Sequence, residues 1–245
     1  MKARTLVIGD IHGADRALEQ ALQRAEVRHQ DTVICLGDYV DGWSGSSAVI
    51  SRLIRLNETN ECVFIRGNHD VWCEAWLEQE ASDVTWLFNG GEATLASYEH
   101  LSRSDKQLHL GFFQRMRNYY VDKGNRLFIH AGFSSMHGPA RETHASNCYW
   151  DRTLWETALA LNPQLEKDSA YYPKRLNLFE EIYIGHTPTI NYGSDQPMSR
   201  ANLWNLDTGA GFDGRVTVMD IESKAYWQSD PVRTLYPAEK GRNKE

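Results

Sequence analysis

A short apolar segment, a polar turn containing glycine and an amphipathic helix follow one another three times in the first third of the sequence. The apolar segments are residues 5–8, 32–36 and 62–65, and the turns that follow them read GDIHG, GDYVDG and RGNHD. Short strands that alternate with helices are typical of parallel β-α-β units. The sequence therefore predicts an α/β fold that begins with parallel strands.

The rest of the sequence first favours helices and then strands. We expect helices near 92–100, 104–117 and 153–161, a hairpin of 119–121 with 127–130, and strands at 181–185, 202–206, 215–221 and 224–228. The turn at 212–214 suits antiparallel pairing of the strands beside it. No repeat or linker interrupts the pattern. The prediction is one domain over residues 1–236, followed by a flexible tail at 237–245.

Composition limits where this protein works and what it binds. The 245 residues are 41% hydrophobic and 24% charged, which is enough for a large buried core. The net charge of -7 disfavours nucleic-acid binding driven by electrostatics. Neither a signal-peptide core nor an apolar run of about 20 residues is present. We therefore expect no membrane contact. The four cysteines, at 35, 62, 73 and 148, form no CxxC pair, so we expect reduced thiols and hence a cytoplasmic location.

Polar side chains gather where the predicted strands end. These residues are Asp10, His12, Asp38, Asp41, Asn68, His69, Asp70, His130 and His186. The ends of parallel strands share one edge of a sheet, which is the usual place for a ligand site. Taken singly, each residue is as well explained as a turn or cap residue, but their joint occurrence favours a site. Carboxylate, imidazole and amide ligands together suit Mn, Fe or Zn. A pair of such ions is the usual arrangement for hydrolysis of phosphate esters.

The motifs in this order resemble those of the calcineurin-like metallophosphoesterases. They are GDIHG (9–13), GDYVDG (37–42), GNHD (67–70), HAG (130–132) and GHT (185–187), and the resemblance runs from about residue 5 to about residue 221. Within the family they resemble the phosphoprotein phosphatase branch, whose bacterial relatives include lambda-type serine/threonine phosphatases and symmetrical diadenosine tetraphosphatases. The resemblance implies a sandwich of two central mixed β-sheets flanked by helices.

The resemblance also implies a role for each motif residue. Asp10, His12 and a shared Asp38 would hold a first divalent ion, and Asp38, Asn68, His130 and His186 would hold a second. The two ions would be Mn²⁺, with Fe or Zn as alternatives, and a hydroxide bridging them would attack phosphorus. His69 would be the general acid, oriented by Asp41, and Asn68 would also contact phosphate.

The sequence departs from the motifs of that branch at three points. Gly42 stands where the branch has a phosphate-gripping arginine, Asp70 replaces a glutamate, and HAG replaces HGG. Either the metal ions alone or another cation must then bind the phosphate. Arg152 is the first candidate and Arg66 the second, because a guanidinium fork matches two phosphate oxygens. The competing interpretations are a surface arginine at a helix start for Arg152 and a partner of a nearby carboxylate for Arg66. Trp43, in a motif loop, is a candidate for the cleft wall.

These residues together favour a metal-dependent phosphomonoesterase that acts on phosphoserine or phosphothreonine in proteins. The first alternative is a hydrolase of diadenosine tetraphosphate or another small phosphoester. The second alternative is a regulatory module that binds metal without turnover, against which the complete ligand set and His69 argue. The expected partner is therefore a phosphorylated protein or a small phosphoester, with no nucleic acid or membrane.

Overall fold

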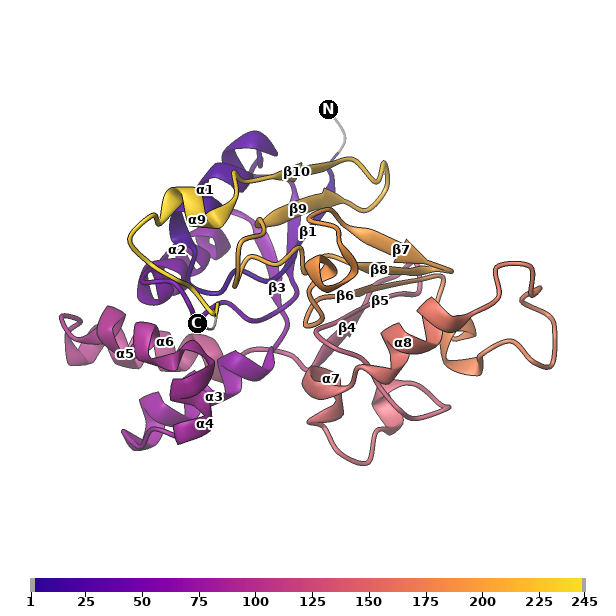
Figure 1. Ribbon diagram of the computed structural model, residues 1–245, viewed down its shortest axis with the longest axis horizontal. Helices are drawn as coiled ribbons and strands as arrows, with labels where there is room; N and C mark the ends of the chain where they lie inside the picture. Colours follow the sequence, from indigo (N-terminus) through magenta and orange to yellow (C-terminus); the bar gives the residue numbers. More distant parts are fainter. Residues whose placement is uncertain (1–2, 244–245) are drawn as a thin grey trace.

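The computed structural model describes residues 3–243, in which two five-stranded β-sheets lie face to face with helices outside them (Figure 1). The first sheet has the order β10(Tyr226–Gln228), β9(Thr217–Asp220), β1(Thr5–Ile8), β2(Thr32–Cys35), β3(Glu61–Phe64). The second has the order β4(Tyr119–Val121), β5(Arg126–Ile129), β6(Glu181–Ile184), β8(Leu203–Asn205), β7(Met198–Arg200). The predicted fold, two mixed sheets flanked by helices, is confirmed.

Strand direction matches the prediction for the first three strands and for the hairpin, whereas the parallel pairing of β6 with β8 was not predicted. β1, β2 and β3 are parallel, with Leu6 opposite Val33 and Val33 opposite Cys62. In the second sheet β5, β6 and β8 are parallel, while β4 pairs antiparallel with β5 as the expected hairpin. The outer strands β7, β9 and β10 are antiparallel to their neighbours. The carboxyl ends of six parallel strands are therefore available to build a site.

Alternation along each strand sends side chains to two different cores. Leu6 and Ile8 of β1 point away from the second sheet and join the core between the first sheet and its helices, whereas Val7 packs between the two sheets. The inter-sheet core also contains Phe128 and Tyr183, whose rings stack with centroids 5.1 Å apart. Burial on both faces fixes the register of these short apolar strands, because a slip of one residue would exchange the two faces.

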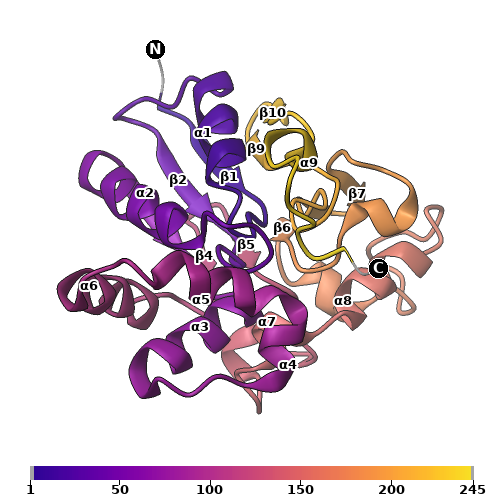
Figure 2. The ribbon, with the colours of Figure 1, turned by 60° about the vertical axis from the view of Figure 1, so that its left-hand side comes forward.

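The outer faces of the sheets are covered by helices. α1(Asp15–Arg24) and α2(Ser46–Thr59) pack on the first sheet, and α8(Thr153–Ala160) packs on the second. Figure 2 shows α3(Asn68–Gln79), α5(Glu92–Tyr98) and α6(Arg103–Gln114) grouped below α2. Three helices are short: α4(Val84–Trp86), α7(Asn147–Trp150) and α9(Val232–Leu235). No helix within residues 3–243 has both the length and the apolar character needed to cross a membrane.

One sequence-based expectation differs from the structure. The turn at 212–214 does not join two paired strands, because β8 belongs to the second sheet and β9 pairs with β1 in the first. The described part of the predicted tail, residues 237–243, is hydrogen-bonded to the rest of the domain. The Glu239 carboxylate accepts hydrogen bonds from Ser44 N at 2.9 Å and Oγ at 2.7 Å, and Arg242 N donates to Gly211 O at 2.8 Å. Residues 244–245 lie outside the described residues.

Candidate active site

The six predicted metal ligands all follow parallel strands. Asp10 and His12 follow β1, Asp38 follows β2, and Asn68 follows β3. From the second sheet, His130 follows β5 and His186 follows β6. All six side chains are buried. Because parallel strands end at one edge, the structure brings together residues that are up to 176 positions apart in the chain, such as Asp10 and His186.

The backbone around these ligands is crowded and partly strained. His12, Asp38 and His186 have φ values of 53°, 53° and 67°, in the left-handed region that costs a residue with a side chain about 1–3 kcal/mol. The Asp38 carboxylate lies directly against Gly67, where any Cβ would collide with it. The glycine of the third motif is therefore required by a close approach. Strain of this kind is common where a fold fixes functional groups.

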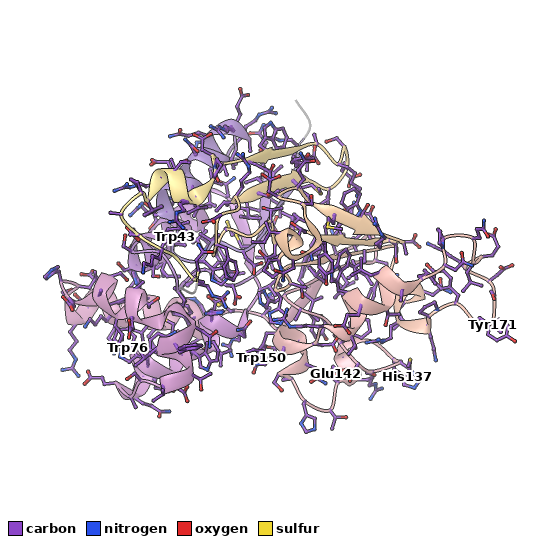
Figure 3. The ribbon with its side chains drawn as sticks, viewed as in Figure 1. Trp43, Trp76, His137, Glu142, Trp150 and Tyr171 are labelled. Atoms are coloured by element: carbon purple, nitrogen blue, oxygen red, sulfur yellow. The ribbon has the colours of Figure 1, made fainter. Side chains whose placement is uncertain are left out.

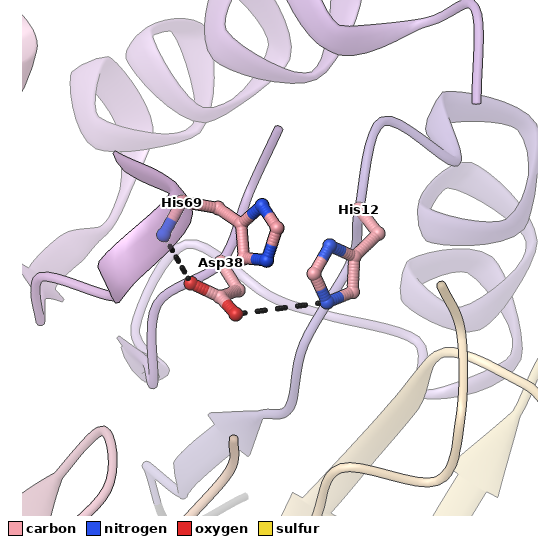
Figure 4. A group of neighbouring side chains, drawn as sticks. All are labelled: His12, Asp38 and His69. Atoms are coloured by element: carbon pink, nitrogen blue, oxygen red, sulfur yellow. Dashed lines mark hydrogen bonds and ion pairs between the residues drawn. The ribbon is translucent and has the colours of Figure 1, made fainter. Parts of the chain in front are cut away.

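Asp38 lies between two groups of ligands. Its Oδ2 is 3.6 Å from His12 Nε2, and its Oδ1 is 3.4 Å from His130 Nε2. Figure 4 shows the first of these contacts and the hydrogen bond that His69 N donates to Asp38 Oδ1 at 3.0 Å. Among residues 3–243, two clusters have ligand atoms that lie within 4.8 Å of one another. They are His12, Asp38 and His69, and Asp38, His130 and His186.

Backbone carbonyls hold two of the histidine rings in one orientation. His130 Nδ1 lies 2.8 Å from Leu36 O, and His12 Nδ1 lies 3.2 Å from Val40 O. A ring nitrogen facing a carbonyl carries the proton, so Nε2 of each ring is left with its lone pair. Both Nε2 atoms face the Asp38 carboxylate. This arrangement is typical of histidines that ligate metal ions.

The site brings acidic side chains close together beside an imidazole nitrogen that has no partner in the described residues. Burial, Asp207 and Asp38 raise the pKa of Asp10 well above its ordinary value. His186 Nε2 is buried and has no hydrogen-bond partner in the described residues. Crowded carboxylates and an unpartnered imidazole nitrogen are groups that a divalent cation satisfies. The residues present therefore fit the two ions that the motifs predict.

His69 and Asp41 form a buried pair at the edge of this centre. His69 Nδ1 lies 2.6 Å from Asp41 Oδ2. Asp41 also accepts hydrogen bonds from Trp86 Nε1 at 2.8 Å and from Thr94 Oγ1 at 2.6 Å. With its position fixed in this way, the carboxylate holds the Nδ1 proton, and Nε2 is the nitrogen available for chemistry in the cavity. Neither Trp86 nor Thr94 was predicted, because neither belongs to a motif.

Asp70 joins the second and third motif loops. Its carboxylate accepts hydrogen bonds from the backbone N–H groups of Asp38 at 2.8 Å, Tyr39 at 2.9 Å and Gly67 at 2.8 Å. Burial and the Asp38 charge raise the pKa of Asp70 to about 7. The shorter side chain that departs from the phosphatase-branch motif therefore has a structural task, which is to hold the loop that presents Asp38.

A cavity of about 230 Å³ opens over the ligands. Its lining is Asp38, Asn68, His69, Trp72, Thr85, Asn89, Trp150, Arg152, His186 and Arg242. Figure 3 shows Trp150 between the helical group of residues 68–114 and the second half of the molecule. Trp72 and Trp150 meet edge to face, with ring centroids 5.4 Å apart. The predicted cleft residue Trp43 is instead fully buried and donates to Ala210 O at 2.7 Å, so that prediction was wrong.

The two predicted phosphate arginines have different surroundings. Arg152 lines the cavity, and its Nη1 donates to Thr187 Oγ1 at 3.2 Å. Arg66 forms an ion pair with Glu74 at 2.9 Å, donates to Phe113 O at 3.1 Å and lies outside the cavity lining within residues 3–243. Arg66 is therefore not placed for phosphate. Arg242, which the sequence assigned to a tail, lines the cavity instead.

Comparisons with known proteins agree with this geometry. A family model described as calcineurin-like phosphoesterase matches residues 3–212. Serine/threonine-protein phosphatase 1 of Salmonella typhimurium is 26% identical over 222 residues, covering 88% of this chain and 91% of the relative. An asymmetrical bis(5'-nucleosyl)-tetraphosphatase of Anoxybacillus flavithermus is 25% identical over 228 residues, covering 87% and 88%.

Two solved structures show the same fold. A serine/threonine phosphatase from Saccharomyces cerevisiae superposes with a TM-score of 0.58 at 14% identity, covering 93% of this chain and 80% of the other. A metallophosphoesterase from Sphaerobacter thermophilus gives a TM-score of 0.56 at 16% identity, covering 93% and 89%. At such identities the likeness concerns the fold alone.

Proposed function

The chain belongs to the calcineurin-like phosphoesterase family and is a metal-dependent phosphatase, and from this premise we propose that it hydrolyses phosphoserine and phosphothreonine in proteins. The observation that carries the proposal is the buried pair of His69 and Asp41 beside the ligand cluster, joined at 2.6 Å. The alkoxide of serine or threonine is strongly basic and leaves only as it gains a proton. A fixed imidazole at the cavity supplies that proton.

The size of the cavity supports the same class of substrate. Its volume of about 230 Å³ is below the roughly 300–1,000 Å³ typical of pockets that enclose a whole small ligand. A phosphoryl group and the first atoms of its leaving group fit within such a space. The remainder of the substrate then lies outside, as a protein carrying a phosphorylated side chain would.

The described residues divide the work as follows. Asp10, His12, Asp38, Asn68, His130 and His186 would hold two divalent ions, for which Mn²⁺ is our first choice and Fe or Zn the alternatives. When bound, the ions supply Lewis-acid charge and a hydroxide near neutral pH. Asn68 and Arg152 bind phosphate oxygens, Asp41 orients His69, and His69 Nε2 donates the proton to the leaving oxygen.

A second candidate substrate is a dinucleoside polyphosphate. Trp72 and Trp150 line the cavity, and Trp150 keeps 44% of its surface exposed. An exposed indole beside a phosphate site, here that of Trp150, offers a stacking surface for a nucleobase. The phosphoprotein remains the first candidate, because a polyphosphate leaving group is weakly basic and has less need of His69.

Metal dependence and substrate class are tested together. We expect EDTA to abolish activity and Mn²⁺ to restore it, because the site consists of carboxylate, imidazole and amide ligands. Phosphate release is measured with phosphoserine and phosphothreonine peptides, p-nitrophenyl phosphate and diadenosine tetraphosphate. We expect the phosphopeptides to give the highest kcat/KM. A higher value for diadenosine tetraphosphate favours the second candidate, and full activity in metal-free protein contradicts both.

Arg152→Ala is expected to raise KM and lower kcat/KM by about 10–100-fold, as the loss of a charge-assisted hydrogen bond to phosphate does. Arg152→Lys recovers only part of this, because an ammonium lacks the planar fork. Steady-state kinetics on a phosphopeptide make the measurement, with the exposed Arg141→Ala as the control. Unchanged kinetics in both Arg152 variants would leave Arg152 with only its structural hydrogen bonds to Thr187 and His186.

A further inference from the structure

We propose that Arg242 is a phosphate-binding residue of this site, carried into the cavity by the segment 237–243. The inference rests on the proposed function. Arg242 lines the same cavity as Asp38, His69 and Arg152. Figure 1 draws its segment in yellow, running from α9 back toward the middle of the molecule. The chain therefore supplies a second guanidinium to the site from residues that lie beyond all the motifs.

The two arginines lie beside different ligand groups. Arg242 Nη1 is 3.2 Å from Nε2 of His12, the nitrogen that would ligate the first ion, so a bound ion replaces this contact and leaves the guanidinium free for an anion. Arg152 Nη1 is 3.2 Å from Thr187 Oγ1 and 3.5 Å from His186 O. An anion held over the ligands therefore meets one guanidinium on the His12 side and one on the His186 side. Two forks acting on one phosphoryl group oppose the repulsion expected from the acidic side chains around it.

Three glycines leave room for the Arg242 side chain where it extends to the cavity. A Cβ at Gly42 would lie 2.9 Å from Arg242 Cγ, and a Cβ at Gly90 would lie 3.3 Å from the same atom. A Cβ at Gly211 would lie 3.1 Å from Arg242 Cδ. Three segments far apart in sequence thus have no side chain where the arginine stem passes. Gly42 is the position at which the second motif lacks its arginine, so the space left there is filled by the stem of another.

The segment is anchored close to the arginine. Arg242 N donates to Gly211 O at 2.8 Å, and the guanidinium carbon lies 5.2 Å from the Phe212 ring centroid. Gly241 packs so tightly on the Trp43 indole that a Cβ there would be 2.5 Å from Cζ2. Two residues before it, Glu239 accepts hydrogen bonds from Ser44. An anchored backbone limits the conformational entropy lost when the side chain binds an anion.

The guanidinium itself keeps donors that the protein does not use. Arg242 Nε is buried and has no hydrogen-bond partner in the described part of the chain. No carboxylate oxygen within residues 3–243 lies within ion-pair distance of this guanidinium, whereas Arg66 pairs with Glu74. Buried polar groups are nearly always satisfied, and charged donors gain most from an anionic partner. A phosphate in the cavity supplies such a partner.

Binding of inorganic phosphate tests the proposal without turnover. Isothermal titration calorimetry on Mn²⁺-loaded protein compares wild type, Arg242→Ala, Arg242→Lys and Arg233→Ala. Arg233 is a matched control, since it lies close in sequence on α9 and faces Asp213 at the surface. We expect the Kd of phosphate to rise by about 10–100-fold in Arg242→Ala, to recover partly in Arg242→Lys and to stay unchanged in Arg233→Ala.

Metal content and kinetics separate this role from its alternatives. Elemental analysis should find two ions per chain in every variant, and KM for a phosphopeptide should rise in Arg242→Ala. Loss of metal in Arg242→Ala would mean that Arg242 supports His12, and it would overturn the proposal. An unchanged Kd of phosphate in folded Arg242→Ala would also overturn the proposal. The same holds if the wild-type protein binds no phosphate. If wild type binds phosphate through Arg242 yet hydrolyses no ester, the proposed function fails and this inference stands.

Discussion

Asp38→Asn is expected to lose phosphatase activity down to the level of metal-free protein. Both oxygens of Asp38 face imidazoles, with Oδ1 3.4 Å from His130 and Oδ2 3.6 Å from His12. Burial alone would raise the pKa of Asp38, but the neighbouring imidazoles of His130, His69 and His12 hold it well below its ordinary value. The group is therefore the anion shared by both clusters. An amide removes the charge and replaces one ligand oxygen with a nitrogen that carries protons.

The substitution keeps the shape of the side chain, so its effect on folding can be separated from its effect on metal. The amide oxygen of asparagine can still accept the hydrogen bond that His69 N donates at 3.0 Å. Elemental analysis should find fewer than two ions per chain, while the circular dichroism spectrum stays that of wild type. Asp168→Asn, at an exposed position, is the control and should keep both ions. Full metal content together with wild-type kcat in Asp38→Asn would contradict a shared carboxylate.

The sequence could predict which polar side chains gather at one edge of the sheets, because their positions depend on local pattern. Each of these residues comes within a few residues of the end of a short apolar strand, and Asp10, Asp38 and His130 are examples. Because the strands are parallel, their carboxyl ends lie at one edge of the sheet regardless of the conformation of the loops between them. Period-two alternation, as in Leu6, Val7 and Ile8, likewise predicted that the strands are buried. These features require no knowledge of distant contacts.

The features that could not be predicted depend on contacts across the chain. Trp86 and Thr94 fix Asp41 from helices that carry no motif. For Arg66, which stands beside a motif, the sequence left phosphate and a nearby carboxylate as alternative partners, and only the contact with Glu74 of α3 decides between them. Arg242 belongs to a polar segment with no periodic pattern, and its place is set by glycines in three other loops. The sequence indicates the need for a replacement cation but contains no local signal that points to residue 242.

His69→Asn is expected to lower kcat for a phosphoserine peptide by about 10²–10⁴-fold, the usual contribution of a general acid. Asparagine cannot carry the proton that the Asp41-oriented imidazole presents to the leaving oxygen. By distance alone, however, His69 also groups with His12 and Asp38 as a metal ligand. Elemental analysis separates the two roles. A proton donor leaves two ions per chain in the variant, whereas a ligand loses one.

The leaving group gives the sharper test of the same substitution. A p-nitrophenolate leaves without much help, so His69→Asn should slow p-nitrophenyl phosphate far less than a phosphoserine peptide. The exposed His137→Asn serves as the control and should change neither rate. Equal losses for both substrates, with two ions still bound, would assign His69 to orienting phosphate instead. A selective loss ties the His69–Asp41 pair to esters with basic leaving groups, which is the property that favours a phosphorylated side chain over a polyphosphate as the substrate.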